Sequence, residues 1–156
     1  MFEQTEEPML WVRLLVAAGA GLTLGLPYRK RPGGVRTHLL VTLGAALFCT
    51  TAVRYAARSD EDVLRVLQGI TSGIGFVGAA SVIKRGNYIL GITTAASIWI
   101  AAAVGCEAAL GSPLLVIVVA PSIALLSWGV AVLERRVFHR VRRLRQPRPR
   151  RAAARP

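Results

Sequence analysis

The chain has 156 residues, of which 53% are hydrophobic and only 18% charged, and its mean hydropathy is +0.48. A soluble globular domain needs more charge than this to cover its surface, so the composition argues against that class. The formal net charge of +12 is concentrated in short segments between long apolar runs. This distribution is typical of a membrane-topology signal rather than of a nucleic-acid-binding surface.

Apolar stretches long enough to cross a bilayer recur five times. A transmembrane helix needs about 20 mostly apolar residues, and the stretches that qualify cover residues 9–26, 38–56, 63–83, 89–110 and 113–133. Acidic residues precede the first stretch where a signal peptide carries a basic segment, so we expect this stretch to remain as a span. The sequence therefore predicts an all-α, polytopic membrane protein with five transmembrane helices, the fifth of them kinked at Pro121.

Basic residues predict the orientation of the five spans. They lie in the first loop, in the third loop and after the last span, namely Arg29, Lys30, Arg31, Arg36, Lys84, Arg85 and the C-terminal arginines. By the positive-inside rule these segments are cytoplasmic, which places the N-terminus outside and the C-terminus inside. We therefore expect an exterior segment over residues 1–8, a membrane domain over 9–133 and an Arg-rich cytoplasmic tail over 134–156.

The tail combines arginines with apolar residues at helical spacing. Residues 135–145 predict a short amphipathic helix lying on the anionic inner leaflet, and residues 146–156 predict a disordered stretch rich in Pro and Ala. The expected lipid contacts are Arg135, Arg136, Arg140, Arg142, Arg143 and Arg145. The alternative is a tail that only fixes the topology.

The third stretch is unusually rich in glycine, with Gly69, Gly73, Gly75 and Gly78 within ten residues. One interpretation is close helix packing, because small residues four apart let backbones approach, as Gly21 and Gly25 would in the first span. The other is a broken helix whose freed backbone groups line a polar site, as in transporters.

Polar and aromatic residues in the fourth stretch are candidates for local roles. We expect the hydroxyls of Thr93 and Thr94 to cap the start of this helix, although a helix N-terminus also suits an anion. Trp99 lies too deep to be an interface anchor, which predicts that it packs between helices.

Charged residues near the predicted exterior ends of the spans are Arg13, Arg54, Arg65, Asp62 and Glu107. Charges at membrane depth tend to be paired or functional, so these could form ion pairs; the alternative is a set of independent snorkelling side chains. Asp62 and Arg65 are three apart on one helix, which makes theirs the first contact to expect.

Nothing in the sequence suggests catalysis, a metal site or a cofactor. Cys49 and Cys106 have no partners at metal-ligand spacing and are interpreted as small apolar residues. The spacing of Gly73, Gly75 and Gly78 fails as a dinucleotide fingerprint, because no βαβ unit surrounds it.

Four sequence blocks in order resemble the membrane domain of the MgtC/SapB family. They are Arg36-Thr37-His38-Leu39-Leu40-Val41, Gly44-Ala45-Ala46-Leu47-Phe48, Ser72-Gly73-Ile74-Gly75-Phe76-Val77-Gly78-Ala79 and Gly91-Ile92-Thr93-Thr94-Ala95-Ala96-Ser97-Ile98-Trp99. The resemblance implies a bacterial inner-membrane protein associated with low magnesium and stress adaptation. It marks Arg36, Thr37, Asp62, Arg65, Gly73, Gly75, Gly78, Thr93, Thr94 and Trp99 as functional candidates.

Two departures limit what the resemblance implies. Family members often have Gly-Leu-Glu-Arg where this chain has Gly25-Leu26-Pro27-Tyr28, so a role for that acid does not transfer. The soluble C-terminal domain of some members has no counterpart in the 156 residues. We expect a non-enzymatic protein that modulates a membrane-protein partner or magnesium homeostasis, or alternatively a small, homo-oligomeric ion transporter or channel.

Overall fold

The structure, a computed structural model, describes residues 6–31, 33–55, 60–86 and 88–144. Its elements in chain order are α1 (Glu6–Gly25), the 3₁₀ helix η1 (Leu26–Tyr28), α2 (Val35–Tyr55), α3 (Asp60–Ala80), β1 (Ile83–Arg85), β2 (Tyr88–Leu90), α4 (Ile92–Leu110) and α5 (Pro113–Leu144). Each of the five α-helices is long and apolar enough to cross a membrane. The predicted all-α, five-span architecture is confirmed.

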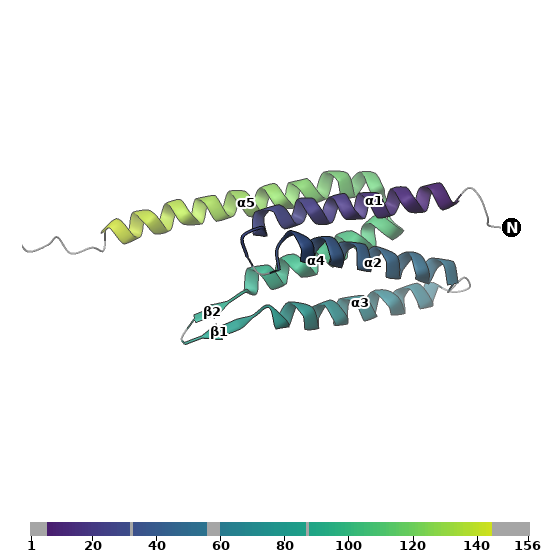
Figure 1. The fold of residues 1–156 in the computed structure, drawn as a ribbon, viewed down its shortest axis with the longest axis horizontal. Helices are drawn as coiled ribbons and strands as arrows, with labels where there is room; N and C mark the ends of the chain where they lie inside the picture. Colours follow the sequence, from purple (N-terminus) through teal and green to yellow (C-terminus); the bar gives the residue numbers. More distant parts are fainter. Residues whose placement is uncertain (1–5, 32, 56–59, 87, 145–156) are drawn as a thin grey trace, which may run out of the picture.

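Helix α4 lies inside the bundle and contacts the other four helices (Figure 1). Helices α1 and α5 lie side by side on one flank, whereas α3 lies on the opposite flank and packs against α2 and α4. Half of the α4 span is buried, and only a small part of the α3 span is. The bundle therefore has a closed side built from α1, α2, α4 and α5 and a more loosely covered side at α3.

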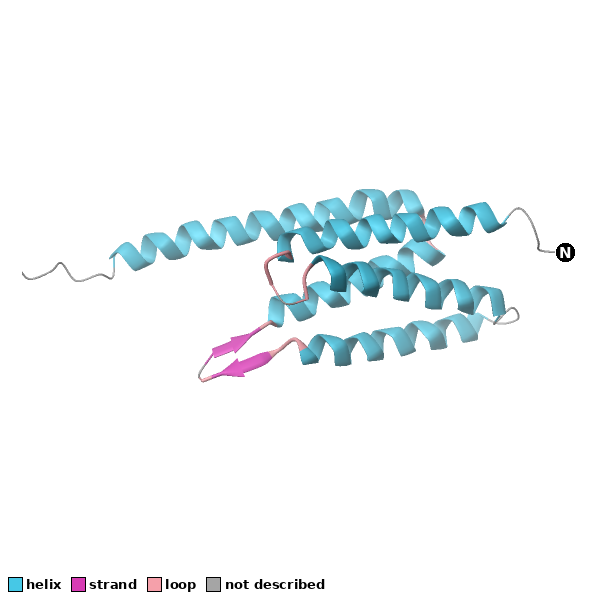
Figure 2. Cartoon of the chain, viewed as in Figure 1, coloured by secondary structure: helices cyan, strands magenta, loops and turns pink. Residues whose placement is uncertain are grey.

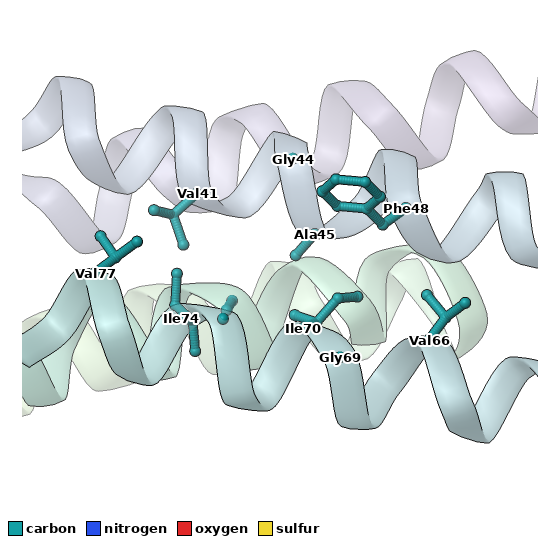
Figure 3. A pocket seen from close by; sticks show the side chains of 11 residues that line it. Val41, Gly44, Ala45, Phe48, Val66, Gly69, Ile70, Ile74 and Val77 are labelled. Carbon is teal, nitrogen blue, oxygen red and sulfur yellow. The ribbon is translucent and has the colours of Figure 1, made fainter.

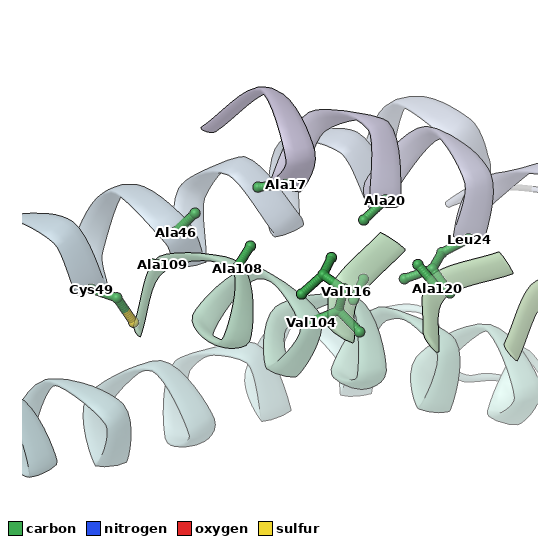
Figure 4. Close-up of a cluster of buried hydrophobic side chains, with 11 residues drawn as sticks. Ala17, Ala20, Leu24, Ala46, Cys49, Val104, Ala108, Ala109, Val116 and Ala120 are labelled. Carbon is green, nitrogen blue, oxygen red and sulfur yellow. The ribbon is translucent and has the colours of Figure 1, made fainter. Parts of the chain in front are cut away.

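Small side chains form the core of the closed side. Figure 4 shows this core between α1, α2, α4 and α5, with Ala17, Ala20, Ala46, Cys49, Ala108 and Ala120 among its members. Within lipid there is no hydrophobic gain from burying apolar groups between helices, so packing depends on close backbone approach, which small residues permit.

Glycines bring three of these helices together. A Cβ added at Gly21 would lie 2.8 Å from the Cα of Leu39, and one at Gly25 would lie 2.5 Å from the Cα of Val35. On α4, a Cβ at Gly105 would collide with the carbonyl oxygen of Thr42. The predicted close packing at Gly21 and Gly25 is confirmed, and Gly105 extends it to the contact between α2 and α4.

A β-hairpin replaces the predicted inner ends of the third and fourth spans (Figure 2). Its register pairs Ile83 with Leu90 and Arg85 with Tyr88, so residues 83 and 89, which we predicted to be helical, lie in strands. Gly86, after β1, and Gly91, between β2 and α4, adopt positive φ angles of 61° and 93°, which favour glycine. Hydropathy alone could not separate a short apolar strand from the end of a helix.

Helix α5 continues from Pro113 to Leu144 without a break. Residues 135–144 are helical, as predicted, but they form the last turns of α5 and not a short helix of their own, because Leu133, Glu134, Arg135 and Arg136 are good helix formers and nothing among them ends α5. That this segment lies on the inner leaflet stays a prediction. Arg145 and the predicted disordered stretch lie outside the described residues, as do the side chains of residues 138–144.

The segments that carry the basic residues meet at one end of the bundle. The loop after α1, the hairpin and the C-terminal end of α5 share this end, and the end of α2, the start of α3 and the connection from α4 to α5 share the other (Figure 1). Arg29, Arg36, Lys84, Arg85 and Arg135 are exposed there. We call this the basic end; that it faces the cytoplasm stays a prediction.

Candidate functional site

Buried polar side chains gather near the basic end, between α2 and α4. Among the described residues, the buried polar side chains are His38, Thr42 and Thr94. His38 is 0% exposed although histidine is ordinarily only intermediate in burial. Since a buried polar group is costly without partners, the contacts of this cluster define what it can do.

The hydrogen bonds of His38 join two helices. Its Nδ1 lies 2.9 Å from the carbonyl oxygen of Gly34, the residue before α2, and its Nε2 lies 3.0 Å from Oγ of Ser97 on α4. Ser97 in turn donates to the carbonyl oxygen of Thr94 at 2.8 Å. The chain Gly34–His38–Ser97–Thr94, which we call the histidine network, therefore links α2 to the first turns of α4.

The loop after α1 covers the histidine network. The ring of Tyr28, in η1, stacks on the His38 ring with centroids 5.3 Å apart and an interplanar angle of 15°. Gly33, at φ 77°, approaches Thr94 and Ile98 so closely that an added Cβ would lie 3.0 Å from Cγ2 of Thr94. Loop, α2 and α4 therefore form one packed unit at the basic end.

At the opposite end, Arg13 of α1 holds the end of α4. Its Nη1 donates to the carbonyl oxygen of Ala109. It also lies 3.4 Å from the carbonyl oxygen of Ala108 and 3.2 Å from that of Gly111. Oε1 of Glu107 accepts from the backbone N–H of Ser112 at 3.3 Å. Arg13 is thus anchored on backbone carbonyls, where we had weighed pairing with Glu107 against snorkelling.

A groove opens between α2 and α3 on the loosely covered side (Figure 3). Its volume is about 520 Å³, and its walls are apolar or glycine. The lining residues include Val41, Gly44, Phe48, Gly69, Gly73 and Ile74. We call this the α2–α3 groove; its chemistry suits an apolar occupant and offers no polar group for an ion.

The glycines of α3 fit neither of the two interpretations, a broken helix or close packing against another helix of this chain. Helix α3 is continuous, so the broken-helix interpretation is wrong. Close packing within the chain also fails at Gly69, Gly73 and Gly75, because a Cβ added there would meet nothing within 4 Å. Only Gly78 has a neighbour, with its added Cβ 3.6 Å from that of Ala95 on α4. The glycine-rich face of α3 is therefore open.

Two expectations for α4 are corrected. Gly91 occupies the N-cap position with no side-chain hydrogen bond, so Thr93 and Thr94 do not cap the helix: Thr93 is exposed and Thr94 is buried against the loop. Trp99 is 51% exposed and does not pack between helices. The buried face of α4 follows Thr94, Ile98, Ala101 and Gly105 at helical spacing, which turns position 99 outward.

The other predicted residues are spread over the bundle. Arg36 is exposed and Thr37 half-buried in the first turn of α2, and neither side chain is a member of the histidine network. Arg65 is exposed on α3, and the side chain of Asp62 lies outside the described residues, so their pairing stays a prediction. Of the predicted lipid contacts, Arg135 and Arg136 are exposed; Arg140, Arg142, Arg143 and Arg145 lie where no side chain is described.

Sequence reasoning missed two contacts between α2 and α4. His38 and Ser97 stand inside quoted blocks, yet their pairing needs the helices aligned in space. Cys49 on α2 and Cys106 on α4 are free thiols that lie close enough to interact. Similar distances from the N-terminal ends of two parallel spans were the only signal available in the sequence. In the described part of the chain, no three His, Cys, Asp or Glu side chains gather to hold a metal ion.

The fold and the buried network define a multi-pass α-helical membrane protein packed through small residues. Residues 14–136 match the MgtC family, and the chain belongs to this family.

Three bacterial relatives illustrate the match. The chain is 39% identical over 116 residues to the uncharacterized protein slr0014 of Synechocystis, covering 68% of this chain and 49% of that protein. It is 35% identical over 102 residues to the putative magnesium transporter YhiD of Escherichia coli, covering 60% and 47%. It is 36% identical over 112 residues to protein MgtC of Salmonella typhimurium, covering 68% and 47%.

The chain thus spans about half the length of these curated relatives. No solved structure matches it.

Proposed function

We propose that the chain is a non-enzymatic regulator in the bacterial inner membrane that affects magnesium homeostasis by binding a membrane-protein partner in the α2–α3 groove. The observation that carries this proposal is the groove itself, which is apolar, lies at the depth of the spans and is bordered by glycines with open space above them. A transmembrane helix of a partner fits such a surface, because glycines admit a facing backbone closely. One relative's name, putative magnesium transporter, supplies the link to magnesium.

The packing of the closed side supports a regulator over a conduction pathway within one chain. Its core is a cluster of buried apolar side chains, most of them alanines, that packs α1, α2, α4 and α5 together. The groove on the other side offers an ion no polar ligand, and an ion in the membrane needs polar groups to replace its water. Transport would therefore require an oligomer in which several chains together form the path.

A groove-filling variant tests the proposal. A bacterial strain lacking its own MgtC-family gene would express the parent, Gly73→Leu or Gly129→Leu in low-magnesium medium, with growth, cellular magnesium and membrane protein level measured. Gly129 is the matched control, since its added Cβ also meets nothing within 4 Å but it lies on α5, away from the groove. We expect Gly73→Leu to lose the effect and Gly129→Leu to retain it.

Two outcomes would contradict parts of the proposal. If Gly73→Leu, at the same membrane protein level, supports growth and cellular magnesium as the parent does, the groove is not part of the mechanism. If the parent itself changes neither growth nor cellular magnesium, the protein has no role in magnesium homeostasis. Magnesium flux through purified protein in liposomes would instead establish the transporter alternative.

A further inference from the structure

The histidine network has one hydrogen too few when His38 is neutral. It contains three close contacts: Nδ1 to Gly34 O, Nε2 to Ser97 Oγ, and Ser97 Oγ to Thr94 O. The two backbone carbonyls only accept hydrogen bonds. A neutral imidazole carries one ring hydrogen and the serine hydroxyl carries one, so two hydrogens must serve three contacts.

When neutral His38 carries its ring hydrogen on Nδ1, the Ser97 hydroxyl can donate to only one of its two neighbours, Nε2 of His38 or the carbonyl oxygen of Thr94. The Nδ1–H of His38 donates to Gly34, which leaves Nε2 as an acceptor. If the Ser97 hydroxyl donates to Nε2, its contact with Thr94 contains no hydrogen; if it donates to Thr94, two lone pairs face each other 3.0 Å apart. Either choice leaves one of the three contacts unmade.

An added proton completes all three contacts. The imidazolium donates from Nδ1 to Gly34 and from Nε2 to Ser97 Oγ, which frees the hydroxyl to donate to Thr94. We propose that His38, Ser97 and Thr94 form a proton-binding site that joins α2 to α4, and that proton uptake turns the Ser97 hydroxyl from His38 to Thr94.

Some features around His38 stabilise the protonated imidazole and others destabilise it. From η1, the stacked Tyr28 ring presents its π face, which attracts a cation within about 6 Å. From α1, the backbone at Gly21 and Gly25 packs against His38. Opposing the charge are burial, the N-terminal ends of α2 and α4, and the exposed Arg29, Lys30, Arg31 and Arg36 at the same end.

The position of the site gives proton uptake a structural consequence. The Thr94 carbonyl, whose contact changes, belongs to the first turn of α4, which packs under the loop at Gly33. Protonation therefore changes the contact between α2, α4 and the loop, without needing any group in the α2–α3 groove.

A titration of the single histidine tests the site directly. The chain contains two histidines, so His139→Gln leaves His38 alone for ¹⁵N-labelled NMR of the full chain in lipid nanodiscs. We expect neutral His38 to carry its hydrogen on Nδ1 and to take up one proton on its imidazole as the sample is acidified. An imidazole that stays neutral at every pH at which the protein remains folded, or a neutral form with the hydrogen on Nε2, would overturn the proposal.

Substitutions at Ser97 test whether the network, and not burial alone, binds the proton. Ser97→Ala removes the acceptor for Nε2–H, and because hydrogen bonds from charged donors are the stronger ones, the midpoint of proton uptake should lie at lower pH than in the parent. Ser97→Thr retains a hydroxyl and should restore most of the shift. The control is Ser122→Ala on α5, where the serine makes the same kind of bond to a backbone carbonyl, Val118 O at 2.7 Å, on an exposed face.

The control should leave the midpoint unchanged. Equal midpoints in the parent and Ser97→Ala would overturn the role of Ser97, and the titration of the parent decides the His38 site even if a Ser97 variant fails to fold.

Discussion

Nη1 of Arg13 lies 3.2 Å from the carbonyl oxygen of Gly111, which is 98 residues further along the chain. This contact, with those to Ala108 and Ala109, ties α1 to the end of α4. The last carbonyls of a helix lack partners within it and carry its partial negative charge, so a guanidinium satisfies both needs. Arg13 acts as a side-chain cap supplied by another helix.

Replacing Arg13 with Ala should destabilise the bundle by about 1–3 kcal/mol, because half-buried carbonyls lose a charged donor. Thermal unfolding in detergent, followed by loss of the monodisperse peak, measures the effect. Arg135→Ala is the control, since that arginine is exposed on α5. Equal melting temperatures for Arg13→Ala and the parent would show that the cap contributes nothing to stability.

Adding one methyl group at Gly105 should also destabilise the bundle. The added Cβ of Gly105→Ala would collide with the carbonyl oxygen of Thr42, so α2 and α4 must separate, and overpacking of this kind costs about 1–3 kcal/mol. Gly129→Ala meets nothing within 4 Å and should not destabilise. The same unfolding assay compares them; a Gly105→Ala protein as stable as Gly129→Ala would contradict the close contact.

The neighbouring thiols of Cys49 and Cys106 predict an internal cross-link between α2 and α4. A membrane-permeant oxidant such as copper phenanthroline should remove two hydrogens per chain and form the disulfide. Intact mass under denaturing conditions, with maleimide labelling of remaining thiols, measures it. Cys49→Ser is the control and should yield no internal cross-link. If both thiols of the treated parent still react with maleimide, the helices are not in this register.

The orientation of the bundle is also testable. A reporter fused after Arg145 should be active in the cytoplasm, and one inserted at Ser59 should be active outside, because the basic end follows the positive-inside rule. Complementary enzyme reporters of the two compartments make the measurement. A C-terminal fusion active outside would reverse the assignment.

Sequence periodicity and charge predicted much of the fold but less of the site. The five helices follow from long apolar runs, and contact of α1 with α2 follows from Gly21 and Gly25. Contacts between distant spans were harder, because lipid and protein interior are equally apolar and hydropathy does not tell which face of a helix is inward. Trp99 was therefore placed inward, and the contact of His38 with Ser97 was missed.

The glycines of α3 also show that the sequence does not tell which helix faces which. Their density predicted a special role, and small size predicted close packing, but packing requires a facing helix. Within this chain that neighbour exists only at Gly78, where Ala95 approaches. Composition identified the unusual segment; only the arrangement of helices distinguishes an internal contact from an open surface.

The length of α5 limits how it can sit in a bilayer. Its 32 residues extend about 48 Å at 1.5 Å per residue, against a hydrocarbon thickness of about 30 Å. Even a tilt of about 40°, the upper end of the usual range, leaves roughly 37 Å along the membrane normal. The last turns must therefore leave the hydrocarbon as a rigid helical extension of the span, and their backbone cannot lie flat on the membrane surface.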